Sequence, residues 1–358
     1  MKNILGKSMK AAIRQSPGKV LCNNISKPEL DGNQKVLIKV LYVGICGSDI
    51  PRVMDTDNKW NGKILGHEAV GIIEEVGSEV LIKYSLKTGD KVAIIPLIPC
   101  FECYFCKRGM YSSCQHYSFI GSRVEGALSE YMLIDPKNLI KLPDDEDIQK
   151  YTFLEPLTVA LHAISQTSIK LGETAVIFGA GTIGLLIMQV LRNLAYYDLI
   201  MVDIDNFKLN LAKKLGSLHN INLTYESLDQ YIKKNIGSTG IDVVFEVSGA
   251  TTAKQNAIQI TQPGGSIVLI GTSHHDIIFD GPTFELITRK ELKLIGSWMS
   301  YSNPFPGSEW QAGVKILQSN LLDIKSIVTH SYKLDEIETA FNMILKNTEK
   351  YCKVMINI

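Results

Sequence analysis

Residues 174–184 read Thr-Ala-Val-Ile-Phe-Gly-Ala-Gly-Thr-Ile-Gly, and this stretch decides the fold of the second half of the chain. Its first five residues are apolar or β-branched, as in a buried strand. Glycine follows at Gly179, Gly181 and Gly184, which is the spacing of a tight turn from a strand into a helix. The apolar run 182–194 predicts that helix. The motif therefore predicts a turn whose helix N-terminus can receive a pyrophosphate.

A second strand is predicted at residues 199–203, and it ends on Asp203. This acid lies about twenty residues beyond the glycines, where a dinucleotide site places the carboxylate that binds a ribose 2′-hydroxyl. A carboxylate there repels a 2′-phosphate, so the pattern favours NAD over NADP. Asp205 is the competing acid, although it lies beyond the strand end. The predicted cofactor-binding residues are Gly179, Gly181, Ile183, Gly184 and Asp203.

Two kinds of pattern divide the chain. From about Leu161, strands and helices alternate, which implies a parallel sheet with right-handed crossovers. The first ~150 residues instead hold short β-branched or apolar runs separated by glycine-containing turns, which predict an irregular all-β domain. Residues 309–319 and 334–345 predict two helices, and residues 353–358 a final strand. The eight residues before Met9 are expected to be an extension with no role in the fold.

Composition excludes several classes of protein. A length of 358 residues predicts two domains, and equal numbers of basic and acidic residues, 37 each, give no global field that would recruit nucleic acid or a membrane. The N-terminus has neither the apolar core of a signal peptide nor a membrane span, so an intracellular, cytoplasmic location is expected. In a reducing compartment, clustered cysteines are metal ligands more often than disulfides.

A cluster of four cysteines has the pattern C-x2-C-x2-C-x7-C at Cys100, Cys103, Cys106 and Cys114. Four thiolates this close together suit a closed tetrahedral zinc site with a structural role. The bacterial iron–sulfur run is the alternative, but it has three residues before its fourth cysteine and a proline after it. Seven residues intervene here and Gln115 follows, so the pattern favours structural zinc.

A second set of metal-binding residue types is spread more widely. Cys46 supplies a thiolate, His67 an imidazole, and Glu155 or Glu68 a carboxylate. Mixed sets of this kind suit a catalytic zinc that keeps one position open for water or substrate. Ser48 follows closely and is the candidate acceptor for a hydroxyl proton. Manganese or cobalt at this site is compatible with the same ligand types.

With these motifs, the chain resembles the medium-chain, zinc-dependent alcohol dehydrogenase superfamily over nearly its whole length. Within it the chain is similar to the polyol branch, which includes sorbitol dehydrogenase, and most of all to dehydrogenases of galactitol 1-phosphate. The stretches that carry the finer similarity are residues 46–52, 96–101, 117–123 (YSFIGSR), 289–292, 295–299, 301–302 and 306–310.

The resemblance implies a fold of α/β plus β class with two domains. A GroES-like β-barrel catalytic domain, residues 1–160, is completed by 299–358, and a Rossmann doubly wound parallel sheet, residues 161–298, is inserted in it. It also implies an active site in the cleft between the domains and a homodimer or homotetramer. Trp298 either lines the substrate pocket or packs at a subunit interface, and the interface is the preferred interpretation.

The resemblance further implies two zinc ions per chain. The structural ion is held by the four cysteines, and the catalytic ion by Cys46, His67 and Glu155, with Glu68 beside it. Glu68 or Glu155 exchanges on and off the catalytic ion in this scheme. Liver-type relatives carry a relay histidine where this chain has Pro51, which leaves Ser48 and water as the proton route.

The implied reaction is the NAD-dependent oxidation of a polyol phosphate, galactitol 1-phosphate to tagatose 6-phosphate. A phosphate requires cations or backbone donors, and arginine suits it through bidentate bonds. The candidates are Arg52 and Arg123, with Lys59 and Lys290 as further options. Oxidation of arabitol phosphate, or of unphosphorylated sorbitol or xylitol, is the alternative within the class. A zinc- and dinucleotide-binding protein without catalysis is the alternative outside it.

Overall fold

The computed structural model describes residues 8–30, 32–194, 198–237, 240–273 and 275–358. They form two compact units. The first comprises the described parts of Met1–Glu155, Tyr301–Ser319 and Val328–Ile358, and the second those of Pro156–Ser300 and Asn320–Ile327. Within the described ranges, every helix is too short or too polar to cross a lipid bilayer.

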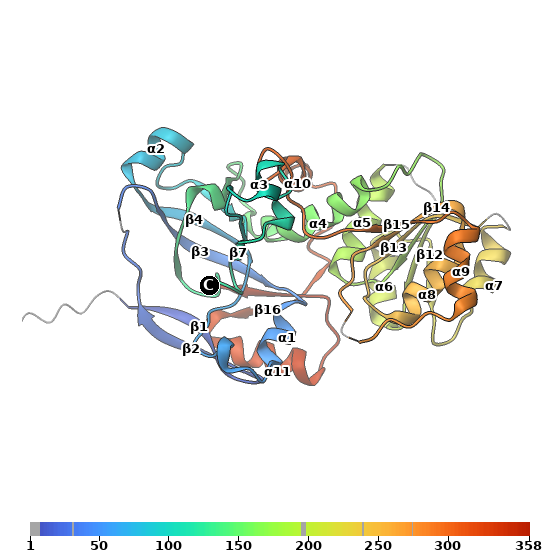
Figure 1. Cartoon of the computed structure of the whole chain (residues 1–358). Helices are drawn as coiled ribbons and strands as arrows, with labels where there is room; N and C mark the ends of the chain where they lie inside the picture. Colours follow the sequence, from blue (N-terminus) through green and yellow to red (C-terminus); the bar gives the residue numbers. More distant parts are fainter. Residues whose placement is uncertain (1–7, 31, 195–197, 238–239, 274) are drawn as a thin grey trace, which may run out of the picture. The chain divides into compact units, whose positions relative to one another are not determined.

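A largely antiparallel sheet frames the first unit (Figure 1). Its strands in the described residues are, in spatial order, β16 (Val328–Lys333), β17 (Lys353–Asn357), β3 (Val36–Ile45), β4 (Glu68–Val76), β5 (Lys91–Ile94) and β9 (Leu139–Lys141), with β8 (Tyr131–Ile134) also paired to β3. The C-terminal strand β17 pairs antiparallel with β3, so the end of the chain completes a sheet built from its beginning. Most of the apolar residues of β3 are buried in the core of this unit.

Smaller elements surround this sheet. They are the hairpin of β1 (Ser8–Ser16) and β2 (Lys19–Ser26), the short pair β6 (Leu97–Ile98) and β7 (Ser118–Phe119), and the helices α1 (Asp49–Met54), α2 (Ser78–Tyr84), α3 (Tyr104–Lys107), α10 (Ser308–Gln318) and α11 (Ile337–Lys346). Ser8 pairs with Ser26 in the hairpin, so the predicted extension is wrong for Ser8. The other residues of that extension lie outside the described residues.

The second unit alternates strands with helices. Its elements are β10 (Ala175–Phe178), α5 (Thr182–Asn193), β11 (Leu199–Asp203), α6 (Asn206–Lys214), β12 (His219–Asn222), α7 (Leu228–Asn235), β13 (Ile241–Glu246), α8 (Thr251–Ile260), β14 (Thr261–Leu269), α9 (Gly281–Arg289) and β15 (Lys293–Gly296). The strands pair in the order β12-β11-β10-β13-β14-β15, and every pairing recorded among them is parallel. Helix α4 (Leu154–Ser165) precedes β10, and most of it belongs to this unit.

Strand β10 shows why the opening motif folds as it does. All four of its residues are buried, as expected for a central parallel strand with helices over both faces (Figure 1). The chain then turns at Gly179, which has φ of 103°, a conformation that glycine adopts without strain. A side chain at Gly184 would lie 1.9 Å from the carbonyl oxygen of Gly179, so the start of α5 packs directly on the turn. The predicted α/β plus β fold class is confirmed.

Candidate metal centres and dinucleotide turn

The four clustered cysteines lie on one loop of the first unit. Cys103 and Cys106 flank the start of the short helix α3, and Cys100 and Cys114 lie on either side of it. All four thiols are free, and their sulfur atoms lie within 4.8 Å of one another. The closest recorded pair, Cys114 and Cys100, is separated by 3.5 Å, well beyond the ~2.05 Å of a disulfide. Bonds of about 2.3 Å to a central zinc ion put tetrahedral sulfurs about 3.8 Å apart, so the cluster fits this ion.

Backbone N–H groups stabilise the thiolate form of cysteines in this loop. The N–H groups of Cys106 and Gln115 lower the pKa of the Cys103 thiol to about 6. The N–H of Cys103 in turn donates to the sulfur of Cys100 over 3.3 Å. A sulfur that accepts backbone hydrogen bonds is stabilised as the anion, which is the form that binds metal.

The mixed set comes from the facing ends of two paired strands. Cys46 follows the last residue of β3, and His67 and Glu68 lie at the start of β4. Gly44 pairs with Glu68 across the sheet, and a side chain at Gly44 would lie 2.3 Å from a carboxylate oxygen of Glu68. The glycine therefore makes room for the carboxylate. One potential ligand atom from each of Cys46, His67 and Glu68 lies within 4.8 Å of the others.

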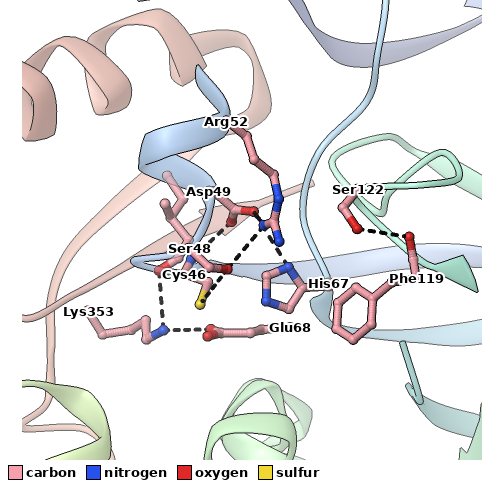
Figure 2. Close-up of polar contacts among 10 residues, drawn as sticks. Cys46, Ser48, Asp49, Arg52, His67, Glu68, Phe119, Ser122 and Lys353 are labelled. Atoms are coloured by element: carbon pink, nitrogen blue, oxygen red, sulfur yellow. Dashed lines mark hydrogen bonds and ion pairs between the residues drawn. The ribbon is translucent and has the colours of Figure 1, made fainter. Parts of the chain in front are cut away.

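Asp49 lies next to His67, and the sequence pattern assigns it no role. Its Oδ1 is 3.5 Å from Nδ1 of His67, and its Oδ2 accepts the N–H of Cys46 over 3.1 Å (Figure 2). Both side chains are almost fully buried. Nδ1 faces this carboxylate at ion-pair distance without a hydrogen bond to it, so Nε2 is the nitrogen left for a metal, as in a carboxylate–histidine–metal arrangement.

The charges around His67 favour a positive charge at this position. Burial lowers the pKa of His67, but the charges of Asp49 and Cys46 outweigh burial and raise it well above the ordinary value. A positive charge is thus favoured at this point even without a metal. A metal ion bound to neutral His67 would supply that charge, so thiolate, imidazole and carboxylate donors all fit a zinc ion here.

Glu68 is held by a lysine from the other end of the chain. Nζ of Lys353, on β17, lies 2.6 Å from Oε2 of Glu68 and also donates to the carbonyl of Ile45 over 3.2 Å (Figure 2). The Glu68 and Lys353 side chains are only 2% and 4% exposed. A buried carboxylate with this partner is neutralised in place. Lys353 therefore competes with a metal ion for Glu68.

Glu155 lies in the first turn of α4 and outside the group of ligand atoms that approach within 4.8 Å. Burial raises its pKa to about 7, and the charges of His67 and Glu68 act on it in opposite directions. Glu155 is therefore an electrostatic neighbour of the mixed set. Glu68 completes the set of three, and Glu155 is a second carboxylate whose charge interacts with those of His67 and Glu68.

Ser48 and Arg52 join the mixed set through hydrogen bonds. Ser48 Oγ donates to Sγ of Cys46 over 3.3 Å and accepts from Nη1 of Arg52 over 3.1 Å (Figure 2). The same Nη1 lies 3.1 Å from Oδ1 of Asp49. Arg52 therefore links the serine to the carboxylate that supports His67.

The other candidate cations are engaged in different ways. Arg123 is exposed, stacks on Tyr117 with 3.7 Å between the guanidinium carbon and the ring centroid, and donates to the Tyr117 carbonyl. Lys59 forms an exposed ion pair of 2.9 Å with Asp57. Lys290 belongs to the second unit, where its Nζ donates to backbone carbonyls at the end of α8. Arg52 is the one of these four candidates with a recorded bond to Ser48.

The dinucleotide turn and its acid are in direct contact. Oδ2 of Asp203, at the end of β11, accepts the N–H of Ala180 over 2.7 Å, and Oδ1 accepts the N–H groups of Ile204 and Asp205 over 2.7 Å and 2.9 Å, three bonds in all. A carboxylate offers about four acceptor positions, so capacity remains for a ribose hydroxyl. The side chain of Asp205 instead caps α6 by accepting the N–H of Phe207. The cap gives Asp205 a separate role and leaves Asp203 as the acid beside the turn.

Substitution of Asp49 by asparagine should weaken metal binding at the mixed set by about 10- to 100-fold, because an amide orients His67 less strongly than a carboxylate. Titration of metal-free protein with zinc against a chromophoric chelator measures this change. The four-cysteine cluster serves as the internal reference, and Asp90→Asn, at another buried aspartate of the same unit, as the matched control. Unchanged zinc affinity at the mixed set in Asp49→Asn would contradict this role.

Two family models match this chain, one within its first part and one mostly within the alternating strand–helix part. A model described as "Alcohol dehydrogenase GroES-like domain" matches residues 32–144, and one described as "Zinc-binding dehydrogenase" matches residues 182–318. The chain is 36% identical to galactitol 1-phosphate 5-dehydrogenase of Escherichia coli K12, over 95% of this chain and 97% of that protein. It is 30% identical to sorbitol dehydrogenase of Bacillus subtilis, over 99% of each.

Among solved structures, the crystal structure of galactitol-1-phosphate dehydrogenase from Escherichia coli is similar with a TM-score of 0.92 and 35% identity. The similarity covers 98% of this chain and 100% of that one. Both the sequence and the structural similarity thus extend over nearly the whole length. The chain belongs to the zinc-dependent, medium-chain alcohol dehydrogenase family and is a dehydrogenase of that family.

Proposed function

We propose that this chain oxidises a secondary hydroxyl of a polyol phosphate, with galactitol 1-phosphate as substrate, tagatose 6-phosphate as product and NAD as hydride acceptor. The observation that carries the proposal is the mixed set of Cys46, His67 and a carboxylate in a chain that also has a dinucleotide turn. A purely structural metal site has no need of an open position or of a nearby hydroxyl such as Ser48. The alternative of a non-catalytic binding protein is therefore disfavoured.

We assign the metal ligands as follows. The catalytic zinc is held by Cys46 and His67, with Glu155 or Glu68 as the carboxylate, and it supplies Lewis-acid chemistry that lowers the pKa of the substrate hydroxyl. A second, structural zinc is held by the four-cysteine cluster. Lys353 favours Glu155 as the carboxylate ligand, because it already neutralises Glu68.

The residues around this set give the proton a route. Ser48 Oγ is exposed to solvent, lies beside Cys46, and accepts a hydrogen bond from Arg52. A hydroxyl so placed can take the proton of the substrate alcohol once its own proton, which the structure directs at Sγ of Cys46, turns away and passes to water. The bond from Arg52 fixes the orientation of Ser48 for this transfer. Pro51, which carries no titratable group, leaves the task to the serine.

Asp203 supports NAD as the cofactor. Its carboxylate lies at the end of β11 and touches the turn through Ala180, as expected of an acid that binds a ribose 2′-hydroxyl. The same negative charge would repel the 2′-phosphate of NADP. The glycines Gly179, Gly181 and Gly184, with Ile183, would hold the pyrophosphate at the N-terminus of α5.

Arg52 is the stronger candidate for the substrate phosphate, with Arg123 as the second. Arg52 contacts Ser48 directly, and its side chain keeps 22% of its surface exposed. A bidentate bond from arginine to phosphate is among the stronger polar contacts in proteins. The similarity to sorbitol dehydrogenase supports the alternative in which the substrate carries no phosphate.

We also propose that the chain forms a homodimer or homotetramer. Strand β15 lies at the edge of the six-strand order seen in the second unit. Leu294 on this strand is 42% exposed and Trp298, just beyond it, is 58% exposed. An edge strand with exposed apolar residues is a ready site for pairing with another chain, so we place Trp298 at a subunit interface.

The zinc-loaded protein should produce NADH fastest from galactitol 1-phosphate, when compared with galactitol, sorbitol and arabitol 1-phosphate at equal concentration. NADP should replace NAD poorly, because of Asp203. The initial rate of absorbance change at the NADH band measures both preferences. An equal or higher kcat/KM on an unphosphorylated polyol would contradict the substrate proposal and leave the dehydrogenase assignment in place.

Arg52→Met tests the assignment of the substrate phosphate to Arg52 in the same rate assay. If Arg52 binds the phosphate, its loss should reduce the ratio of kcat/KM for the phosphorylated over the unphosphorylated polyol by about 10- to 100-fold. Arg108→Met, which removes an exposed arginine stacked on a tyrosine, should leave that ratio unchanged.

Ser48→Ala should lower kcat by about 100-fold or more while zinc content stays at the wild-type value, because the serine moves a proton and does not bind the metal. Metal analysis of the preparation measures the zinc content, and initial rates on the same preparation measure kcat. Ser122→Ala is the matched control, since its hydroxyl bonds only the Phe119 carbonyl in the recorded contacts. Wild-type turnover in Ser48→Ala would remove Ser48 from the scheme.

A further inference from the structure

The strand order of the second unit divides the carboxyl edge of its sheet into two halves. From β10 the chain proceeds through β11 and β12 in one direction, and from β13 through β14 and β15 in the other. A dinucleotide lies across the point where this order reverses. Asp203, at the end of β11, marks the adenosine half. The nicotinamide half is therefore expected over the loops that follow β13 and β14, which are residues 247–250 and 270–273.

A buried ion pair lies at the root of these two loops. Glu246, the last residue of β13, is 0% exposed, and its Oε2 is 2.9 Å from Nζ of Lys254 on α8. Its Oε1 accepts the hydroxyl of Ser248 over 2.6 Å and the N–H of Gly249 over 2.8 Å. Glu246 thus holds the first loop by its side chain. It also pairs with Phe178, the residue before the dinucleotide turn.

Lys254 connects the same pair to the second loop. Its Nζ donates to Oγ of Ser273 over 2.8 Å, and Ser273 Oγ donates to the carbonyl of Gly249 over 3.0 Å. The two loops also touch through their backbones, because a side chain at Gly249 would lie 2.2 Å from the carbonyl oxygen of Thr272. The first loop in turn contacts the dinucleotide turn, where a side chain at Gly179 would lie 3.1 Å from the N–H nitrogen of Ser248.

We propose that Glu246 and Lys254, acting through Ser273, are positioning residues that hold these two loops in the conformation that receives the nicotinamide half of the dinucleotide. The inference rests on the proposed dinucleotide-dependent function. A buried ion pair stabilises a fold little when compared with apolar residues of the same size, because both charges lose their water. Here the ion pair fixes the conformation of the two loops. Together with four hydrogen bonds it holds them in place, so a bound ligand does not have to order them.

Ser273→Ala on the full chain tests this with little risk to folding, because it removes one hydroxyl that is only partly buried. The Kd for NADH, measured by fluorescence, should rise by about three- to tenfold, as expected for the loss of a hydrogen bond that orders the site. The Kd for ADP-ribose, which lacks nicotinamide, should stay within about twofold of wild type. Thr251→Ala, which removes a hydroxyl at the start of α8 that has no bond to Glu246, Lys254 or Ser273 in the described contacts, should change neither value.

Each other outcome overturns the inference. A wild-type Kd for NADH in Ser273→Ala shows that the link to Ser273 has no role in binding. An equal loss for NADH and ADP-ribose shows general loosening of the unit instead of positioning. A wild-type chain that binds neither compound refutes the proposed dinucleotide function itself, and this inference with it. Lys254→Met, if it folds, should exceed Ser273→Ala in its effect on NADH and still spare ADP-ribose.

Discussion

The antiparallel pairing of β3 with β4 is the constraint on which the candidate catalytic centre depends. It brings Cys46, at the end of one strand, beside His67 and Glu68, at the start of the other. The register matters, because it sets Gly44 opposite Glu68 and so provides the space that the carboxylate fills. A shift of one residue would turn the ligands to the other face of the sheet. The rest of the first unit holds this register in place.

Charge compensation is the second requirement of this centre. Asp49 and Glu68 are buried carboxylates, and each has a cationic partner within the same unit, Arg52 for the first and Lys353 for the second. A buried charge without a partner costs several kcal/mol of folding free energy, so these two cations lower the cost of burying the carboxylates of the ligand set. They also affect its chemistry, since Arg52 holds the carboxylate of Asp49 that faces His67, and Lys353 competes with a metal ion for Glu68. The second unit shows the same principle at Glu246 and Lys254.

Much of this arrangement could be predicted from the sequence where local signals are strong. The strand and helix around Gly179 follow from apolar runs and glycine spacing, and the cysteine cluster follows from spacing alone, since its members lie on one short loop. The hairpin of β1 and β2 was not predicted, because its strands lack a clean alternation of apolar and polar residues. Residues 334–345 were predicted as one helix, but the α-helix begins only at Ile337, after a short 3₁₀ turn.

The partners of the candidate ligands were beyond sequence reasoning for a different reason. Lys353 is 285 residues from Glu68 along the chain, and only the return of β17 to β3 brings them together. Lys254 and Glu246 are close in sequence, but nothing in their pattern shows that both are buried. Asp49 offered a weak signal, since a carboxylate three residues after a thiolate ligand can face the same site. Contacts set by the tertiary fold therefore decide the details that local patterns leave open.

We propose that one chain carries two metal sites of different chemistry, a four-thiolate cluster and a mixed set of thiolate, imidazole and carboxylate ligands. Metal analysis of the purified protein, combined with X-ray absorption at the zinc edge, tests it most directly. The account predicts about two zinc ions per chain, with an average first shell of both sulfur and nitrogen or oxygen ligands. About one zinc per chain with sulfur ligands alone, or iron with inorganic sulfide, would contradict it.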